Sequence, residues 1–243
     1  MRNIRLVLEY EGTYYQGWQK QQNTPHTIQA ILENTLEGVV GHSVKIIGAG
    51  RTDRGVHAKN QVANFFTTSR LNPYNIEKAL NVRLPQDIKV KKAEDVDLEF
   101  HARFWAKAKT YKYFIINSRT ENVFWKRFSW HIPYRLDLEL IRKESFSLLG
   151  RNDFRSFCAS GLSGDTLRTL YRIEIRKKGE IVSIEIKADG FLYKMARNIV
   201  GTLVDIGRGK INLPLKKILG SRERRLAGRC APPQGLFLWK VEY

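Results

Sequence analysis

The chain has 243 residues, 42% of them hydrophobic, which is enough apolar material for one or two packed cores. It contains no run of roughly 18 consecutive apolar residues and no signal-peptide pattern at its N-terminus, so we expect a soluble, cytoplasmic protein without a membrane partner. Lys and Arg number 42 against 24 Asp and Glu, and this net charge of +18 favours a polyanion such as RNA over a membrane surface.

The first hundred residues have the pattern of a βαββαβ unit. Alternating apolar residues predict strands, and an apolar stripe formed by Ile28, Leu32, Leu36 and Val39 predicts a helix that Thr27 can cap. The expected elements are a strand at 4–10, a helix at 27–40, strands at 44–47 and 61–67, a helix at 73–84 and a strand at 88–92. This order is typical of the ferredoxin-like fold.

A similar order recurs in the second part of the chain. The expected elements are a strand at 110–116, a helix at 137–149, strands at 171–177 and 181–188 around a KKGE turn, a helix at 191–206 and a strand at 236–241. We therefore predict an α+β protein with two ferredoxin-like lobes, residues 1–100 and 101–243, that share a largely antiparallel sheet with a central basic cleft.

The stretch GAGRTDRGVHA at residues 48–58 joins two of the predicted strands. Its one carboxylate, Asp53, stands between Arg51 and Arg54 in a segment rich in glycine. Glycines let the backbone pass close to a ligand and cationic neighbours keep a carboxylate charged, so Asp53 is a candidate base or nucleophile. The spacing alone fits a turn aspartate with local hydrogen bonds equally well.

This loop resembles the catalytic loop of the pseudouridine synthases. Four more blocks resemble segments of that family in the same order: YEGTYYQGWQKQ at 10–21, FHARFWAKAKTYKYF at 100–114, FLYKMARNIVGTLVDIG at 191–207 and APPQGLFL at 231–238. The blocks span almost the whole chain. The resemblance implies isomerisation of uridine to pseudouridine in the anticodon arm of tRNA, at positions 38 to 40, by a homodimer that needs no cofactor.

The resemblance also implies roles for four residues. Asp53 matches the nucleophile, Arg197 the arginine paired with it, Tyr111 the tyrosine that stacks on the target base, and Arg51 an arginine that holds the RNA where the base is extruded. Leu236 and Leu238 match one apolar position ambiguously, so neither is assigned. An enzyme that acts on a base must take it out of the stack, but the route of the aspartate and the preferred uridine stay open.

Spacing alone gives these residues ordinary interpretations as well. Arg197 fits a solvated position at the edge of an apolar helical stripe, and Tyr111 fits packing on a strand face with Tyr113. His57 is expected to form a hydrogen bond that stabilises the loop. Candidate phosphate contacts are Arg103, Lys107, Lys109, Lys112, Lys216, Lys217, Arg222, Arg224, Arg225 and Arg229.

Two other functional classes have weaker support. A noncatalytic RNA-binding module usually carries an RNP1-like aromatic run, which this sequence lacks. A metal-dependent nuclease needs clustered carboxylates, whereas Asp53, Asp165 and Asp189 stand in unrelated contexts. The histidines have no ligand spacing, so no metal is expected, and Cys158 and Cys230 are expected to be reduced, largely buried thiols.

Overall fold

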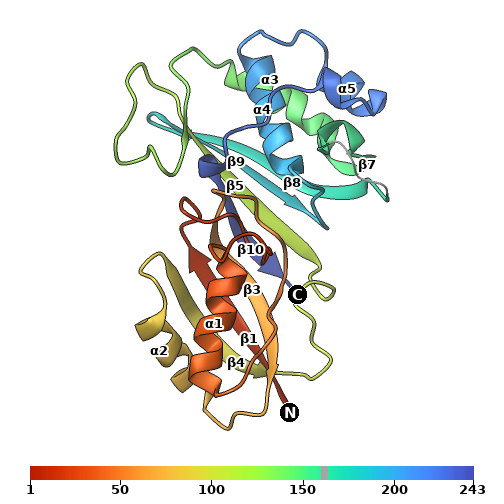
Figure 1. Cartoon of the computed structure of the whole chain (residues 1–243). Coiled ribbons are helices and arrows are strands. Elements are labelled where there is room, and N and C mark those ends of the chain that lie inside the picture. Colours follow the sequence, from red (N-terminus) through yellow and green to blue (C-terminus); the bar gives the residue numbers. More distant parts are fainter. Residues whose placement is uncertain (160–163) are drawn as a thin grey trace. The chain divides into compact units, whose positions relative to one another are not determined.

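The computed structural model describes residues 1–159 and 164–243 and divides them into two compact units (Figure 1). The first unit contains Met1–Lys107 and Phe237–Tyr243, and the second contains Ala108–Leu236. Helices and mostly antiparallel strands occur in both, which confirms the predicted α+β class. Within the described ranges, no helix is both long and apolar enough to cross a membrane.

The first unit has the strand order of a ferredoxin-like fold. Its elements are β1 (Arg2–Tyr10), α1 (Ile28–Val40), β2 (Ile47–Gly48), β3 (His57–Thr67), α2 (Pro73–Arg83), β4 (Ile88–Val96) and most of β10 (Leu236–Glu242). Strand β1 lies between β4 and β3 and is antiparallel to both, and β2 pairs with β3. Strand β10 also pairs with β3, in parallel, at the start of β3.

Helix α1 begins and ends at the residues that the sequence pattern indicates. The Thr27 hydroxyl accepts a hydrogen bond from the Ala30 N–H at 3.3 Å, which confirms the predicted N-cap. Ile28, Leu32 and Leu36 are buried as expected, but the last buried position of the stripe is Val40 and not Val39.

The predicted strand at 44–47 is wrong, because β2 contains only Ile47 and Gly48. Val44 and Ile46 are nevertheless buried. The alternation in the sequence therefore records which side chains face the core, although the backbone there forms no ladder.

A second core within the first unit includes residues of the segment that follows β4. Phe100 and Ala102 are buried together with Ala49 and Val62. The side chain of Asn3 donates to the Phe100 carbonyl at 2.9 Å, and the N–H of Ala102 donates to Asn64 Oδ1 at 2.9 Å. These buried amides satisfy backbone groups that would otherwise lie without partners in the core.

The second unit contains a four-stranded antiparallel sheet in the order β5-β9-β8-β7. Its elements are β5 (Ala108–Ile116), β6 (Trp130–His131), α3 (Leu138–Ser145), β7 (Gly150–Asp153), β8 (Leu167–Lys178), β9 (Ile181–Ala188), α4 (Met195–Gly207) and α5 (Leu215–Ser221). Short 3-10 turns lie at 146–148, 155–157, 224–226 and 233–235. Strands β6 and β7 and helix α5 were not predicted.

Helix α4 differs from its prediction at its start and in its exposure. It begins at Met195, not at 191, because Lys194 adopts a left-handed conformation with φ of 60°. Every residue of α4 is buried except Arg197, which is half-buried. The solvated position that spacing suggested for Arg197 is therefore only half-exposed, and the polar residues Asn198, Thr202 and Asp205 of α4 are buried.

Candidate active site

The segment that carries Asp53 is held by the backbone of residues 12–18. The carbonyl of Thr52 accepts a hydrogen bond from the Trp18 N–H at 3.0 Å, and the N–H of Gly55 donates to the Tyr15 carbonyl at 3.4 Å. The Asp53 carbonyl accepts from Val56 at 3.1 Å and closes a tight turn. Asp53 itself is half-buried, so its side chain projects from a backbone with little freedom to move.

Two glycines allow this close approach. A Cβ on Gly12 would lie 2.0 Å from the Val56 carbonyl oxygen, and a Cβ on Gly17 would lie 2.7 Å from the Thr52 carbonyl oxygen. Gly17 also has φ of +95°, which side chains with a Cβ rarely adopt. The motif resemblance assigns no role to Gly12 and Gly17 of the block YEGTYYQGWQKQ, although two glycines so close together are a signal of a close backbone contact.

Buried polar side chains form hydrogen bonds that stabilise the loop. The hydroxyls of Tyr10 and Thr52 lie 2.8 Å apart, and the Gln61 amide donates to the Gly50 carbonyl at 2.7 Å. Burial raises the pKa of the Tyr10 phenol far above its ordinary value, and hydrogen bonds to Thr52 and Gln61 offset only part of that effect. Tyr10 therefore stays neutral and serves as a fixed support of the loop.

His57 has the structural role that its position suggested. It is fully buried, and its Nδ1 accepts a hydrogen bond from the Gly12 N–H at 3.0 Å. Its ring stacks on Phe237, with centroids 4.6 Å apart. The predicted stabilising hydrogen bond is confirmed, and it ties the loop to the same segment that contacts Thr52.

The candidate residues of the second unit lie at the start of α4 and on β5. Arg197 donates through Nε to the Ala231 carbonyl at 2.8 Å, while its own carbonyl accepts from the Ala231 N–H at 3.1 Å. Nearby, the Tyr113 hydroxyl donates to the Pro232 carbonyl at 2.8 Å. Burial raises the pKa of Tyr113 well above its ordinary value, and the positive charge of Arg197 offsets part of this.

Tyr111 lies two residues before Tyr113 on β5 and is only 7% exposed. Its ring meets that of Phe191 edge-on, with centroids 4.8 Å apart and an interplanar angle of 79°. Tyr111 is therefore packed against Phe191 within the second unit.

The four candidates divide between the two units. Arg51 and Asp53 share one loop of the first unit, where Arg51 is exposed. Tyr111 and Arg197 belong to the second unit. Leu236 and Leu238 are both buried, so burial does not choose between them.

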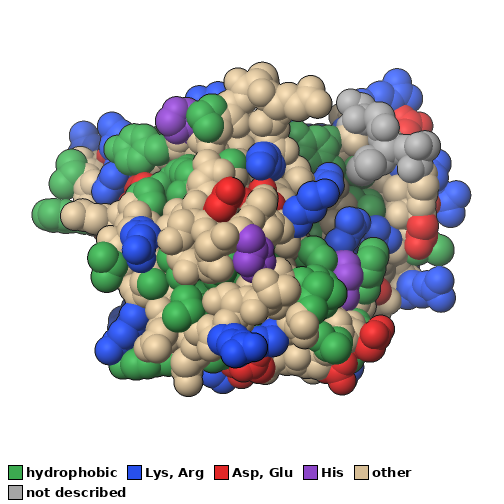
Figure 2. Space-filling view, turned by 60° about the horizontal axis from the view of Figure 1, so that its bottom comes forward, with side chains coloured by type: hydrophobic (Ala, Val, Ile, Leu, Met, Phe, Trp, Pro, Cys, Tyr) green, Lys and Arg blue, Asp and Glu red, His purple; other side chains and the backbone are tan. Residues whose placement is uncertain are grey.

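Several of the candidate phosphate contacts interact with the protein itself. Arg222 pairs with Asp153 at 3.1 Å, Arg229 pairs with Asp205 at 3.3 Å, Arg225 pairs with Glu223, and Arg224 donates to Asn198 at 3.0 Å. The exposed members of the set are Arg103, Lys107, Lys216, Lys217, Arg222, Arg225 and Arg229. Figure 2 shows Lys and Arg side chains spread over the face in view, with fewer acidic side chains among them.

Cys158 is buried, Cys230 is half-buried, and both are free thiols, as expected. Among the residues that the structure describes, no three His, Cys, Asp or Glu side chains lie close enough together to hold a metal ion.

Comparison with known proteins gives the family. The model of the tRNA pseudouridine synthase family matches residues 6–105 and 145–243. The tRNA pseudouridine synthase A of Acetivibrio thermocellus is 44% identical over 245 residues, and that of Thermoanaerobacter pseudethanolicus is 47% identical over 245 residues. Both alignments cover 100% of this chain and 100% of the relative.

The chain therefore belongs to the tRNA pseudouridine synthase family, which confirms the resemblance seen in its sequence motifs. One solved structure, of a Cbf5–Nop10–Gar1 complex, matches with a TM-score of 0.42 and 11% identity, over 97% of this chain and 48% of that chain. A likeness of this size carries no argument about function.

Proposed function

We propose that this chain isomerises uridine in the anticodon arm of tRNA, at positions 38 to 40, with Asp53 as the nucleophile. Family membership makes it an isomerase that converts uridine to pseudouridine in tRNA. The position in the tRNA and the residue roles are our proposal. The observation that supports Asp53 most directly is the rigid loop backbone, which fixes one half-buried carboxylate through contacts to residues 12–18.

The reaction requires a charged group close to the sugar and the base. The bond between C1′ and N1 breaks, the uracil turns, a bond forms between C1′ and C5, the proton of C5 is lost and N1 gains one. An ionised carboxylate can add to C1′, add to the base or take a sugar proton, and Asp53 supplies that charge in each route. The base must leave the helical stack before any of these steps.

Arg197 is proposed as the ionic partner of Asp53. It is the one residue of α4 that is not buried, and its Nε is fixed by the Ala231 carbonyl. A guanidinium keeps its charge in a dry site, where an ammonium would lose it more readily. In this proposal, loss of the arginine would leave a carboxylate without its counter-charge, and such losses cost about 3–5 kcal/mol at buried pairs.

Tyr111 is proposed as the platform for the flipped base, and Arg51 as a contact to the RNA beside it. The stacking of one base on an aromatic ring contributes about 1–3 kcal/mol. Arg51 is exposed in the same loop as Asp53, where it can reach a phosphate without desolvating a buried group. The proposal also includes lobes at 1–100 and 101–243 with a basic cleft, a homodimer and a cytoplasmic location.

Release of tritium from C5 tests the reaction. Uridine labelled at C5 in the anticodon arm should lose its tritium to water when the wild-type protein is added. The Asp53→Asn variant keeps the shape of the side chain but lacks its charge, so it should bind tRNA normally and release no tritium. Full release by this variant would remove Asp53 from the chemistry, and wild-type binding without release would favour a noncatalytic RNA-binding module.

Transcripts with a single labelled uridine at 38, 39 or 40 test the position. Release from all three, and none from labelled uridines elsewhere, is expected.

Salt dependence tests the mode of binding. If the protein contacts about 6 to 10 phosphates, its affinity should fall by about 10³ to 10⁵ between 50 and 200 mM salt. A flat response to salt would contradict a cationic RNA-binding surface.

A further inference from the structure

We propose that Gln29 and Glu33 are positioning residues that hold the Asp53 loop in its reactive conformation. This inference rests on the proposed function, because it concerns the geometry of the proposed nucleophile. Both residues lie on α1, one turn apart, so their side chains lie on the same face of the helix. Neither residue belongs to the loop that contains Asp53.

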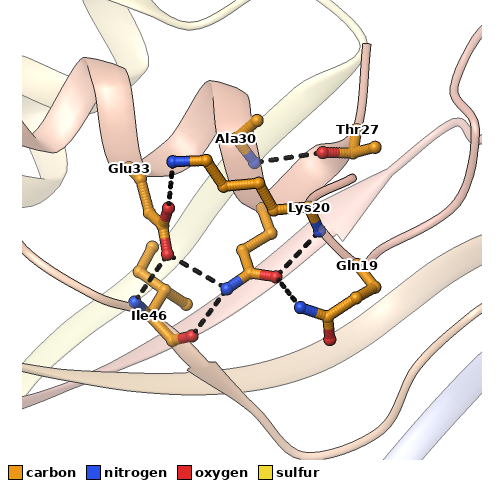
Figure 3. Close-up of polar contacts among 7 residues, drawn as sticks. Gln19, Lys20, Thr27, Ala30, Glu33 and Ile46 are labelled. Atoms are coloured by element: carbon orange, nitrogen blue, oxygen red, sulfur yellow. Dashed lines mark hydrogen bonds and ion pairs between the residues drawn. The ribbon is translucent and has the colours of Figure 1, made fainter. Parts of the chain in front are cut away.

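The two side chains bind one of the segments that flank the loop, namely residues 19 and 20. Gln29 accepts hydrogen bonds through Oε1 from the Gln19 amide at 2.7 Å and from the Lys20 N–H at 2.9 Å. The ammonium of Lys20 pairs with Glu33 at 3.1 Å (Figure 3). These residues follow Trp18, whose N–H donates to the Thr52 carbonyl.

The same two side chains bind the other flanking segment at Ile46. Gln29 donates to the Ile46 carbonyl at 3.2 Å, and Glu33 accepts from the Ile46 N–H at 3.1 Å, so both backbone groups of one residue are held. Figure 3 shows Glu33 reaching both Lys20 and Ile46 from one helix. Ile46 directly precedes β2, which leads into the loop.

The network is partly buried, and its Ile46 contact to Glu33 is fully buried. The amide of Gln29 also donates to Glu33 Oε1 at 3.0 Å, so both side chains share one set of hydrogen bonds. The side chain of Glu33 is only 9% exposed. A buried carboxylate with these partners has few alternative conformations, because each one would leave donors without an acceptor.

The geometric consequence concerns Asp53. The chain enters the loop from Ile46, and residues 17 and 18 contact Thr52 and Asp53. Helix α1 holds residues 17 and 18 through the backbone N–H groups of Ile28 and Gln29, and it holds Ile46 through the side chains of Gln29 and Glu33. Loss of the side-chain bonds to Ile46 lets the chain that enters the loop shift relative to residues 17 and 18, which the α1 backbone still holds. A displacement of about 1 Å in a reacting group can lower a rate by about 10²-fold.

Two variants and one control test the inference. Gln29→Leu removes every hydrogen bond of the amide, and Glu33→Gln keeps the shape while it removes the charge. Thr27→Ala destabilises the same helix by removing its N-cap but leaves both ties in place. The measurements are the single-turnover rate of tritium release, the dissociation constant for tRNA and the melting temperature.

We expect Gln29→Leu to lower the single-turnover rate at least about tenfold with a tRNA dissociation constant within about twofold of wild type. Glu33→Gln should lower the rate in the same direction but less. Thr27→Ala should lower the melting temperature and keep the rate within about twofold. Wild-type rates for both network variants would overturn the inference, as would an equal loss of rate in Thr27→Ala at a matched melting temperature.

Asp53→Asn is measured alongside, because it separates the two proposals. If Asp53→Asn is inactive while Gln29→Leu and Glu33→Gln both turn over at the wild-type rate, only the positioning role falls. If Asp53→Asn releases tritium at the wild-type rate, the proposed nucleophile falls and the positioning role falls with it. If Gln29→Leu does not fold, Glu33→Gln still decides the question, because it changes no volume.

Discussion

Substitution of Gly17 by alanine should displace the Asp53 loop, because the new methyl group has no room. Its Cβ would lie 2.7 Å from the Thr52 carbonyl oxygen and 3.1 Å from the Asp53 carbonyl carbon, both backbone atoms that cannot rotate away. The φ of +95° adds strain of about 1–2 kcal/mol for a residue with a Cβ. Overpacking of a tight contact adds about 1–3 kcal/mol.

A matched control separates the backbone strain from the overpacking. Gly41 also has a left-handed backbone, with φ of +80°, but an added Cβ there would meet nothing within 4 Å. Gly41→Ala should therefore show the backbone strain alone, and Gly17→Ala should exceed it by the overpacking term. Urea denaturation of both variants gives the free energies of unfolding to compare.

Activity should separate the variants further. A shifted loop should slow tritium release by Gly17→Ala about 10²-fold in the folded protein, whereas Gly41→Ala should keep the wild-type rate. The reasoning is refuted if the two variants have the same stability and the same rate, since the close contact at Gly17 would then have no energetic consequence.

Two further perturbations follow from buried groups of the same structure. Burial raises the pKa of Tyr10 and Tyr113, so just above pH 10 these tyrosines ionise only in the unfolded state. The free energy of unfolding should therefore fall by about 1.4 kcal/mol per buried tyrosine at pH 11. Denaturation at pH 8 and at pH 11 measures this fall, and Tyr10→Phe should make it smaller. His57→Leu leaves the Gly12 N–H without its acceptor and should lower the free energy of unfolding by about 1–3 kcal/mol. Asn60→Ser, on the same strand but half-exposed, should lower it less in the same denaturation assay.

The sequence patterns predicted elements best where local signals and burial agree. The helix at 27–40 has an apolar stripe, a Thr27 cap and a glycine after its last turn, and the structure confirms it within one residue. The prediction of a strand at 44–47 was wrong, because alternation of apolar residues indicates which side chains are buried but not whether the backbone pairs with a neighbouring strand. Strand β7 was missed because Gly150–Asp153 has no apolar alternation at all.

The early start predicted for the helix at 191–206 has a specific cause. Leu192 is buried and continues the helical period, so the pattern alone extends the helix toward it. The left-handed backbone of Lys194 separates Leu192 from α4, and no propensity of lysine signals this conformation. Tertiary contacts decided the boundary there.

In the candidate site too, features with a local sequence signal were predicted and contacts between distant segments were not. The resemblance to the family singled out Asp53, Arg51, Tyr111 and Arg197, and the lack of ligand spacing among the histidines correctly left His57 a structural role. The resemblance gave no role to Gly12 or to the side chains of α1 that bind Lys20 and Ile46, because their partners lie far away in the sequence. Contacts of this kind depend on how elements approach each other, which periodicity does not encode.

The parallel pairing of β10 with β3 bears on how the protein is made. Phe237 stacks on His57, and the Tyr243 hydroxyl donates to the Ala102 carbonyl at 2.8 Å, so the first unit needs a strand that the ribosome synthesises after all of the second unit. Domains that are continuous in sequence generally fold in order of synthesis. Here His57, beside the Asp53 loop, can stack on Phe237 only after β10 has been synthesised. A nascent chain that stalls before β10 should therefore contain Asp53, the proposed nucleophile, but lack the β10 contacts that stabilise its loop.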